Sequence, residues 1–259
     1  MTAYYYNQKE KNKQMARTHT YEMAELFPDD IRYSIDSSVI YDHDNVEVVD
    51  TTRYKKPLVL VENTDTASSI YDHCLDDKTV ALNFASFRNP GGQYINGSMA
   101  QEEALCSESF LYNVLKEIPN YYVNNKNKLN GGLYSDKLIY TPSVFFNRGL
   151  MSAKCNIITC AAPNMKYYFD YHKGIDTETY YKLLYNRITL IKQVAEINNN
   201  KTIILGAWGC GVFKNNPDIV ARIFKEVFSQ TSIDVVIYAI PSNKDGNTNY
   251  RIFKKVIED

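Results

Sequence analysis

Glu102 and Glu103 are adjacent carboxylates in a setting that could support acid–base chemistry. The apolar run from Val80 to Phe84 predicts a buried strand, and an irregular loop rich in glycine follows it. Ser98 and Gln101 then fit the S-x-x-Q capping box, which would start a helix with both glutamates just inside it. Ligands of α/β proteins bind outside the carboxyl ends of strands. The sequence therefore predicts two carboxylates beside a ligand-binding loop.

The two glutamates are expected to have different tasks. Adjacent positions on an α-helix point about 100° apart, because the helix has about 3.6 residues per turn. This geometry also excludes the opposed carboxylates of ordinary glycosidases. A simpler interpretation is that acidic residues in a first helical turn complement the helix dipole, which stabilises their ionised form. A catalytic acid would need a raised pKa, caused by burial or by the second carboxylate.

A second strand, glycine loop and helix run from Ile203 to Phe228. The loop from Gly206 to Phe213 contains three glycines, which would let a ligand approach the backbone. Asn216 is a natural N-cap, and Pro217 would take the first helical position. Backbone amides of such a loop can hold a diphosphate. The loop has neither the Gly-Lys-Ser/Thr of a Walker motif nor the third glycine of a dinucleotide fingerprint.

Apolar runs and helical periodicity alternate along most of the chain. The expected strands are Val46–Val49, Leu58–Val61, Val80–Phe84, Leu138–Tyr140, Ile157–Cys160, Ile203–Leu205 and Val235–Ile240. The expected helices are Glu102–Ile118, Thr177–Ile197, Pro217–Phe228 and Thr248–Ile257. Several strands are continuously apolar, which is typical of parallel strands buried on both faces. We therefore expect a three-layer α/β/α fold with a mixed, largely parallel sheet.

The first 45 residues and one internal stretch differ from this pattern. Residues 1–45 are polar, with one expected helix from Asn7 to Leu26 that ends at Pro28. We interpret them as an N-terminal accessory segment packed on a single domain formed by residues 46–259. The stretch from Asn120 to Ser135 is rich in asparagine and glycine and predicts a long surface loop.

Composition limits the expected partners. The net charge of −1 provides no global basic field, so we expect no direct nucleic-acid binding. No apolar run approaches the roughly 20 residues that span a bilayer, and the first residues lack a signal-peptide core. We expect a cytoplasmic protein without a membrane partner. Five cysteines without a C-x-x-C pair, and four scattered histidines, favour neither a disulfide framework nor a metal site.

Four motifs follow one another in the chain: N-F-A-S-x-x-N-P-G-G at Asn83–Gly92, N-G-x-x-x-Q-E-E-A-L-C at Asn96–Cys106, A-A-P-N at Ala161–Asn164 and L-G-A-W-G-C-G-V-F at Leu205–Phe213. Together they resemble the bacterial-type poly(ADP-ribose) glycohydrolases of the macrodomain superfamily. Weaker matches occur at Val61–Thr66 and at Ala239–Ile240. The resemblance extends from about Glu47 to the C-terminus.

This resemblance implies an enzyme that hydrolyses the glycosidic bond of ADP-ribosyl groups on a polymer or a protein and releases ADP-ribose. It implies no cofactor and no metal, with ADP-ribose as the ligand and ADP-ribosylated proteins as partners. By the same resemblance, Glu103 is the catalytic acid and base, and Glu102 helps to hold the distal ribose. The expected ligand-binding residues are Asn83, Asn89, Gly91, Gly92, Gln101, Gly206, Ala207, Trp208, Gly209, Cys210, Gly211, Val212 and Phe213.

One position departs from the family pattern. Gln93 stands where the family usually has a third glycine before Q-E-E. A glutamine there would change the pocket if the position needed a positive φ or bare backbone. Two alternatives stay open: a hydrolase selective for one side-chain linkage such as arginine, and a reader that binds ADP-ribose without cleaving it. Candidates for stacking on adenine are Phe213, Tyr94 and the pair Tyr167–Tyr168.

Overall fold

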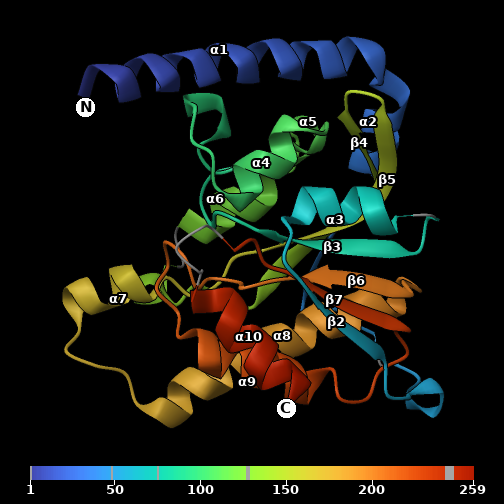
Figure 1. The fold of residues 1–259 in the computed structure, drawn as a ribbon, viewed down its shortest axis with the longest axis vertical. Helices are drawn as coiled ribbons and strands as arrows, with labels where there is room; N and C mark the ends of the chain where they lie inside the picture. Colours follow the sequence, from blue (N-terminus) through green and yellow to red (C-terminus); the bar gives the residue numbers. More distant parts are fainter. Residues whose placement is uncertain (1, 48, 75, 127–128, 243–247) are drawn as a thin grey trace.

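The computed structural model describes residues 2–47, 49–74, 76–126, 129–242 and 248–259. Within these residues, seven strands form one sheet that lies between two layers of helices (Figure 1). The strand order across the sheet is β1-β4-β5-β3-β6-β7-β2. The strands are β1 (Val39–Asp42), β2 (Leu58–Glu62), β3 (Thr79–Phe84), β4 (Lys137–Arg148), β5 (Met151–Cys160), β6 (Thr202–Leu205) and β7 (Val235–Ala239).

Most of the sheet is parallel. β5, β3, β6, β7 and β2 pair in parallel in that order, whereas β4 pairs antiparallel with both β5 and β1. The predicted three-layer α/β fold with a mixed, largely parallel sheet is thereby confirmed. Because the parallel strands run in one direction, their carboxyl ends meet at one edge of the sheet, where α/β proteins bind ligands.

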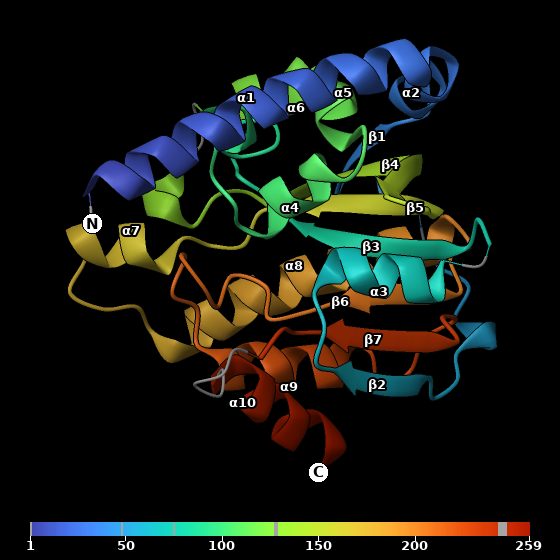
Figure 2. The same cartoon turned by 45° about the horizontal axis from the view of Figure 1, so that its top comes forward.

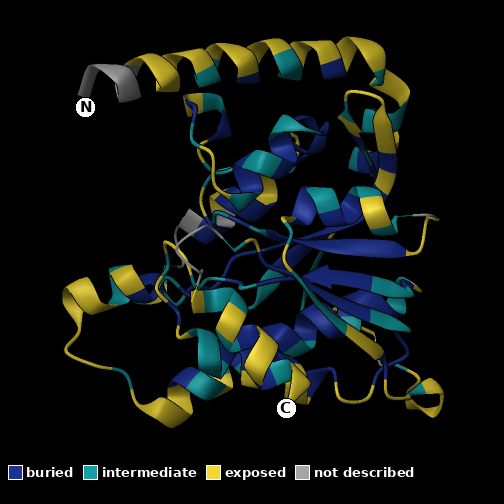
Figure 3. Cartoon of the chain, in the orientation of Figure 1, coloured by how far each residue is buried: buried dark blue, intermediate teal, exposed yellow. Residues whose placement is uncertain are grey.

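The central strand β3 is buried (Figure 3), and its alternate side chains belong to two cores. Val80 and Leu82 join the core with α8, α9 and α10, whereas Ala81 joins the core with α3, α4 and α5. This alternation follows from the two-residue period of a strand, and helices on both faces explain the continuous burial. The helices are α3 (Thr66–His73), α4 (Gln101–Ser107), α5 (Leu111–Leu115), α8 (Thr177–Ile197), α9 (Pro217–Val227) and α10 (Thr248–Glu258).

The N-terminal helix α1 (Thr2–Leu26) begins before its predicted start at Asn7. It packs on the short helix η2 (Tyr94–Asn96) and on α5 rather than on the sheet (Figure 2). A proline then occupies the first position of α2 (Pro28–Asp36), where its missing N–H costs nothing. β1 follows and pairs with β4, so the N-terminal segment contributes an edge strand to the sheet. The domain boundary at residue 45 stays a prediction.

The predicted strand at Val46–Val49 is wrong for Val46, Glu47 and Val49, and Val48 lies outside the described residues. The strand in this region is β1, which ends at Asp42. Val46 instead closes the turn after β1, because its N–H donates to the carbonyl of Asp42. β1 lies at the edge of the sheet and is mostly half-buried, so it lacks the strong apolar pattern on which the prediction depended.

The predicted helix Glu102–Ile118 is two helices, α4 and α5. Ser109 interrupts it: its hydroxyl donates to the Leu105 carbonyl and accepts from the Leu111 N–H, while its backbone bridges to Phe146 in β4. Such side-chain bonds compete with helical ones. By contrast, the predictions are confirmed for the strands β2 to β7 and for the helices α8, α9 and α10. Some of these elements begin or end a few residues from their predicted boundaries.

The predicted surface loop Asn120–Ser135 is also wrong in part. It contains α6 (Pro119–Lys126) and the short helix η3 (Asn130–Gly132), while residues 127–128 lie outside the described part of the chain. Tyr121 and Tyr122 are buried in the core under α1, which makes this stretch part of the fold rather than a surface loop. A further helix, α7 (Met165–Tyr171), follows β5 and was not predicted.

Candidate active site

A cavity of about 650 Å³ opens at the carboxyl ends of β3, β6 and β7. Both glycine loops and the starts of α3 and α4 form its walls. The predicted site residues in its lining are Gly92, Gln101, Glu102, Glu103, Ala207, Trp208, Gly209, Gly211, Val212 and Phe213. The other predicted residues are not part of this lining: Asn83, Asn89, Gly91, Gly206 and Cys210.

α4 begins at Gln101, with Ala100 as its N-cap, so the predicted cap at Ser98 is wrong. Alanine has no side-chain acceptor to cap the helix. The Glu103 carboxylate, at the third helical position, instead reaches back and accepts the Ala100 N–H at 3.0 Å. The loop closes onto the helix through this carboxylate, so the candidate catalytic side chain also organises the helix start.

Glu103 is held by two backbone donors. Its Oε1 accepts the Gln93 N–H at 2.8 Å, and its Oε2 accepts the Ala100 N–H at 3.0 Å. The two donors lie seven positions apart in the segment that precedes α4. Glu103 as a residue is 7 % exposed and lines the cavity. These bonds fix the position of its carboxyl group.

Glu102 lies deeper, at 3 % exposure. Its Oε2 accepts the Ser86 N–H at 2.7 Å, and its Oε1 accepts from Nδ2 of Asn83 at 3.2 Å. Burial nevertheless raises the pKa of Glu102 to about 8, and the charge of Glu103 adds to this rise. Burial therefore favours the protonated form of Glu102.

Asn83 can serve either protonation state of Glu102. Its Nδ2 also donates to Oγ1 of Thr159, the residue beside it on β5, while its buried Oδ1 has no partner among the described residues. Rotation of the amide by 180° would present Oδ1 to the proton of a neutral Glu102. Asn83 thus lies behind the carboxylate rather than in the cavity wall.

Gly92 brings the two carboxylates together. Its φ is +61°, and a methyl group at this position would lie 2.6 Å from Oε1 of Glu103 and 3.0 Å from Oε2 of Glu102. Both side chains therefore reach the same surface, although their positions on the helix diverge. Their partners differ, as expected: Glu103 is bound by the loop, and Glu102 is bound by β3 and the residues that follow it.

The buried Glu102 predicts a pH dependence of stability. Its pKa rises from an ordinary value of 4.5 to about 8 on folding, so the folded state binds the proton more tightly. The stabilisation from this group is complete below about pH 4.5 and is lost as the pH rises through about 8. Calorimetry of the ligand-free protein across this window should show a smaller fall in Tm for Glu102→Gln than for wild type. Glu178→Gln, at the start of α8, should keep the wild-type slope, and an unchanged slope in Glu102→Gln would contradict the assignment.

The second glycine loop is anchored from beneath. Trp208 is fully buried, and its Nε1 donates to the Cys160 carbonyl at 3.0 Å. Nδ2 of Asn215 donates to the carbonyls of Pro163 and Gly209 at 2.8 and 3.1 Å, and its Oδ1 accepts from the Tyr180 hydroxyl at 2.9 Å. These bonds preorganise the loop before any ligand binds.

The same loop presents unpaired backbone donors to the cavity. The N–H groups of Trp208, Cys210, Lys214 and Asn215 donate to carbonyls within the loop. The N–H groups of four cavity-lining residues donate to no acceptor in the described part of the chain: Gly209, Gly211, Val212 and Phe213. Successive free amides of this kind form a concave anion site, which suits a diphosphate.

Two glutamines, Gln93 and Gln101, line the cavity together with the glutamates. The Gln101 amide accepts the Phe84 N–H and donates to Thr66 and to the Leu82 carbonyl, so it joins β3 to α3 and α4. Gln93 has φ −114°, which a glutamine adopts without strain. The departure from the family's third glycine therefore leaves the backbone intact and adds a side chain to the cavity wall beside Glu103.

The cavity also contains residues that the sequence did not single out. The additional residues include Asp65, Thr66, Ser86, Ile240, Pro241 and Asn249. The weak motif matches at Val61–Thr66 and Ala239–Ile240 contain Asp65, Thr66 and Ile240, and Ser86 belongs to the motif at Asn83–Gly92, whereas Pro241 and Asn249 had no sequence signal. Of the aromatic candidates, Phe213 lines the cavity, Tyr94 is buried against α1, and Tyr167 and Tyr168 pack on Tyr171 and His172.

Two kinds of feature are absent from the described residues. No three or more His, Cys, Asp or Glu side chains there converge as metal ligands would. No helix in the described ranges is long and apolar enough to cross a membrane.

Comparison with known proteins places this site in a family. The family model for the catalytic domain of microbial-type PARG matches residues 2–149. The structure of poly(ADP-ribose) glycohydrolase (PARG) from Deinococcus radiodurans in complex with ADP-ribose is 29 % identical, with a TM-score of 0.78, over 88 % of this chain and 96 % of that one. The inhibitor-bound enzyme from Thermomonospora curvata is 24 % identical, with a TM-score of 0.82, over 95 % and 99 %. No curated protein matches. The chain belongs to the family of microbial-type PARG catalytic domains.

Proposed function

We propose that this protein cleaves the glycosidic bond at C1 of the distal ribose of an ADP-ribosyl group and releases ADP-ribose. One observation carries the proposal: the carboxylates above Gly92 and the free amides of the second glycine loop line the same cavity. The amides suit the diphosphate, and the carboxylates suit the ribose and the bond to be broken. The Deinococcus relative was solved with ADP-ribose, which supports the choice of ligand.

Glu103 is the proposed acid and base. As the bond from C1 to the leaving group breaks, the electron pair goes to the leaving atom, and Glu103 supplies its proton. The ribose passes through an oxocarbenium-like state. Water then bonds to C1 and returns a proton to Glu103. Its two backbone bonds hold the carboxyl group at the cavity wall throughout.

The two carboxylates together supply the proton. With the pKa of Glu102 at about 8, this buried pair carries a proton at neutral pH. We assign delivery of this one proton to Glu103, which lies nearer the surface. While Glu103 holds the proton, the carboxylate oxygens of Glu102 accept the hydrogen bond of a ribose hydroxyl.

ADP-ribosylated proteins or their polymers are the proposed partners, and the cytoplasm is the proposed compartment. The five cysteines are free, three of them buried, and Cys155 and Cys160 belong to the sheet. Unpaired cysteines are usual in a reducing compartment.

The deciding experiment offers the protein ADP-ribosyl groups on serine, arginine and glutamate, and as polymer, and measures released ADP-ribose. Release from the polymer is expected. Release from arginine alone would support the linkage-selective alternative. Binding of free ADP-ribose without release from any substrate would make the protein a reader. Both carboxylates would then have no chemical task, and for this reason we favour the enzyme.

A further inference from the structure

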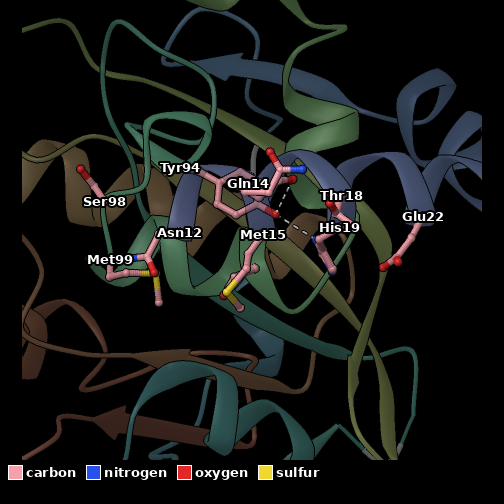
Figure 4. A pocket seen from close by; sticks show the side chains of 11 residues that line it. Asn12, Gln14, Met15, Thr18, His19, Glu22, Tyr94, Ser98 and Met99 are labelled. Carbon is pink, nitrogen blue, oxygen red and sulfur yellow. Dashed lines mark hydrogen bonds between the residues drawn. The ribbon is translucent and has the colours of Figure 1, made fainter. Parts of the chain in front are cut away.

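A second hollow, of about 440 Å³, lies between α1 and the loop that carries Gly92 (Figure 4). We call it the α1 groove. Its residues come from one side of α1, from the loop and from the end of α4: Asn12, Gln14, Met15, Ala16, Thr18, His19, Glu22, Tyr94, Ser98, Met99 and Ser107. None of these residues takes part in the mechanism above.

α1 is fixed to the catalytic loop rather than laid loosely over it. The Tyr94 hydroxyl donates to the Ala16 carbonyl at 3.3 Å and lies 2.9 Å from Nδ1 of His19. Nδ2 of Asn12 donates to the Gly97 carbonyl at 3.2 Å. Gly97 has no room for a side chain, because a methyl group there would overlap the Lys9 carbonyl. The groove therefore has a fixed shape relative to Glu103.

Met99 separates the α1 groove from the catalytic cavity and lines both. Its neighbours divide between the two: Ser98 faces the groove, and Ala100 faces the cavity. The Ala100 N–H is the group that holds Oε2 of Glu103 at 3.0 Å. The leaving atom that Glu103 protonates therefore lies close to Met99, because Ala100 is the next residue in the chain. A leaving group that extends past Met99 enters the groove.

The α1 groove is lined by two methionines and by Glu22, while Lys11 lies on the same side of α1 outside this lining. Met15 and Met99 are 58 % and 64 % exposed, and their thioethers offer a soft surface to a planar base. Lys11, Met15, Thr18 and Glu22 follow one another at helical spacing, so they lie along one side of α1. The exposed Lys11 stands one turn before Met15 and is not itself a lining residue. A nucleotide matches this arrangement if its base lies on Met15 and Met99 and its phosphate lies near Lys11.

We propose that the α1 groove binds the adenosine of the next ADP-ribose unit, which is the leaving group when a polymer is cleaved, with Lys11 near its phosphate. This inference rests on the proposed function. A polymer whose next unit is bound in this way would be preferred over a substrate with a small leaving group. An acceptor peptide is the other conceivable occupant, but two exposed thioethers in the groove, with the exposed Lys11 on the same side of α1, suit a nucleotide better.

The test compares Met15→Glu and Lys11→Glu with wild type on three substrates: poly(ADP-ribose), a mono-ADP-ribosylated peptide, and the p-nitrophenyl glycoside of ADP-ribose. We expect KM for the polymer to rise about ten-fold, with KM for the glycoside unchanged. Arg17→Glu is the matched control. It makes the same charge change on α1 but lies six residues from Lys11, about 120° around the helix, and should change neither value.

Each other outcome overturns the inference. Equal effects on polymer and glycoside would mean that α1 acts only through the catalytic loop. Unchanged polymer kinetics would remove the subsite. An effect on the peptide alone would make the groove a peptide site. If wild type cleaves the glycoside but not the polymer, the groove does not bind the adenosine of a polymer and the inference fails. If wild type cleaves none of the substrates, the proposed function itself is refuted. Unchanged affinity for free ADP-ribose and unchanged Tm confirm that the variants fold.

Discussion

Glu103→Gln is expected to lower kcat for release of ADP-ribose by about 10²–10⁴-fold, the usual contribution of general acid–base catalysis. The glutamine keeps the shape of the side chain and can still accept one of the two backbone N–H groups that bind Glu103. It has no proton to transfer at any working pH. The affinity for ADP-ribose should stay near wild type, because the diphosphate amides belong to the other loop. Steady-state kinetics and calorimetric titration measure the two quantities.

Two matched variants separate catalysis from simpler roles. Glu178→Gln removes a carboxylate from the first turn of α8, outside the cavity, and should leave kcat unchanged. If Glu178→Gln lowered kcat as much as Glu103→Gln does, both glutamates would act only by complementing a helix dipole. Glu102→Gln should raise KM more than it lowers kcat. If Glu102→Gln abolishes release while Glu103→Gln retains it, the two assignments are reversed.

Gly209→Ala is expected to weaken ADP-ribose binding by at least about ten-fold, since strain in a left-handed conformation and steric overlap both act on the loop. Gly209 has φ +73°, and an added methyl group would lie 2.5 Å from Cβ of Ala162 and 2.5 Å from Nδ2 of Asn215. Asn215 is the residue that anchors the loop. Relief of the overlap would displace the free amides that we assign to the diphosphate.

Gly211→Ala is the control in the same loop. A methyl group at Gly211 has open space around it, and its φ is not in the left-handed region. Affinity should therefore change little, although Gly211 lines the same cavity. Titration calorimetry with ADP-ribose compares the two variants. Equal weakening by both would mean that bare backbone at the ligand, rather than loop geometry, sets the affinity, and wild-type affinity in Gly209→Ala would remove the loop from the site.

Much of the fold could be predicted from the sequence because its signals are local. Helical periodicity predicted α8 with both its ends, and Asn216 and Pro217 predicted the start of α9. Apolar runs bounded by turn residues predicted all six strands from β2 to β7. The two glycine loops and the Q-E-E motif indicated the family. Each of these patterns lies within a short stretch of chain, where neighbouring residues decide the conformation.

The errors occur where distant residues decide. Ser109 breaks the long predicted helix because β4 pairs with it. β1 was missed because its partner, β4, begins 95 positions later in the chain, at Lys137. The start of α4 moved from Ser98 to Ala100 as its N-cap, because Glu103 could close the loop in place of a capping hydroxyl.

At the site, the amino-acid sequence specifies which groups are present: two adjacent carboxylates after one glycine loop, and a second glycine loop far along the chain. What these groups can do depends on how the folded chain arranges them. The tertiary structure buries Glu102 enough to raise its pKa, places Glu103 between two backbone donors, and sets α1 against the catalytic loop. Burial, electrostatics and loop packing depend on contacts between segments far apart in the chain, and no local pattern encodes them.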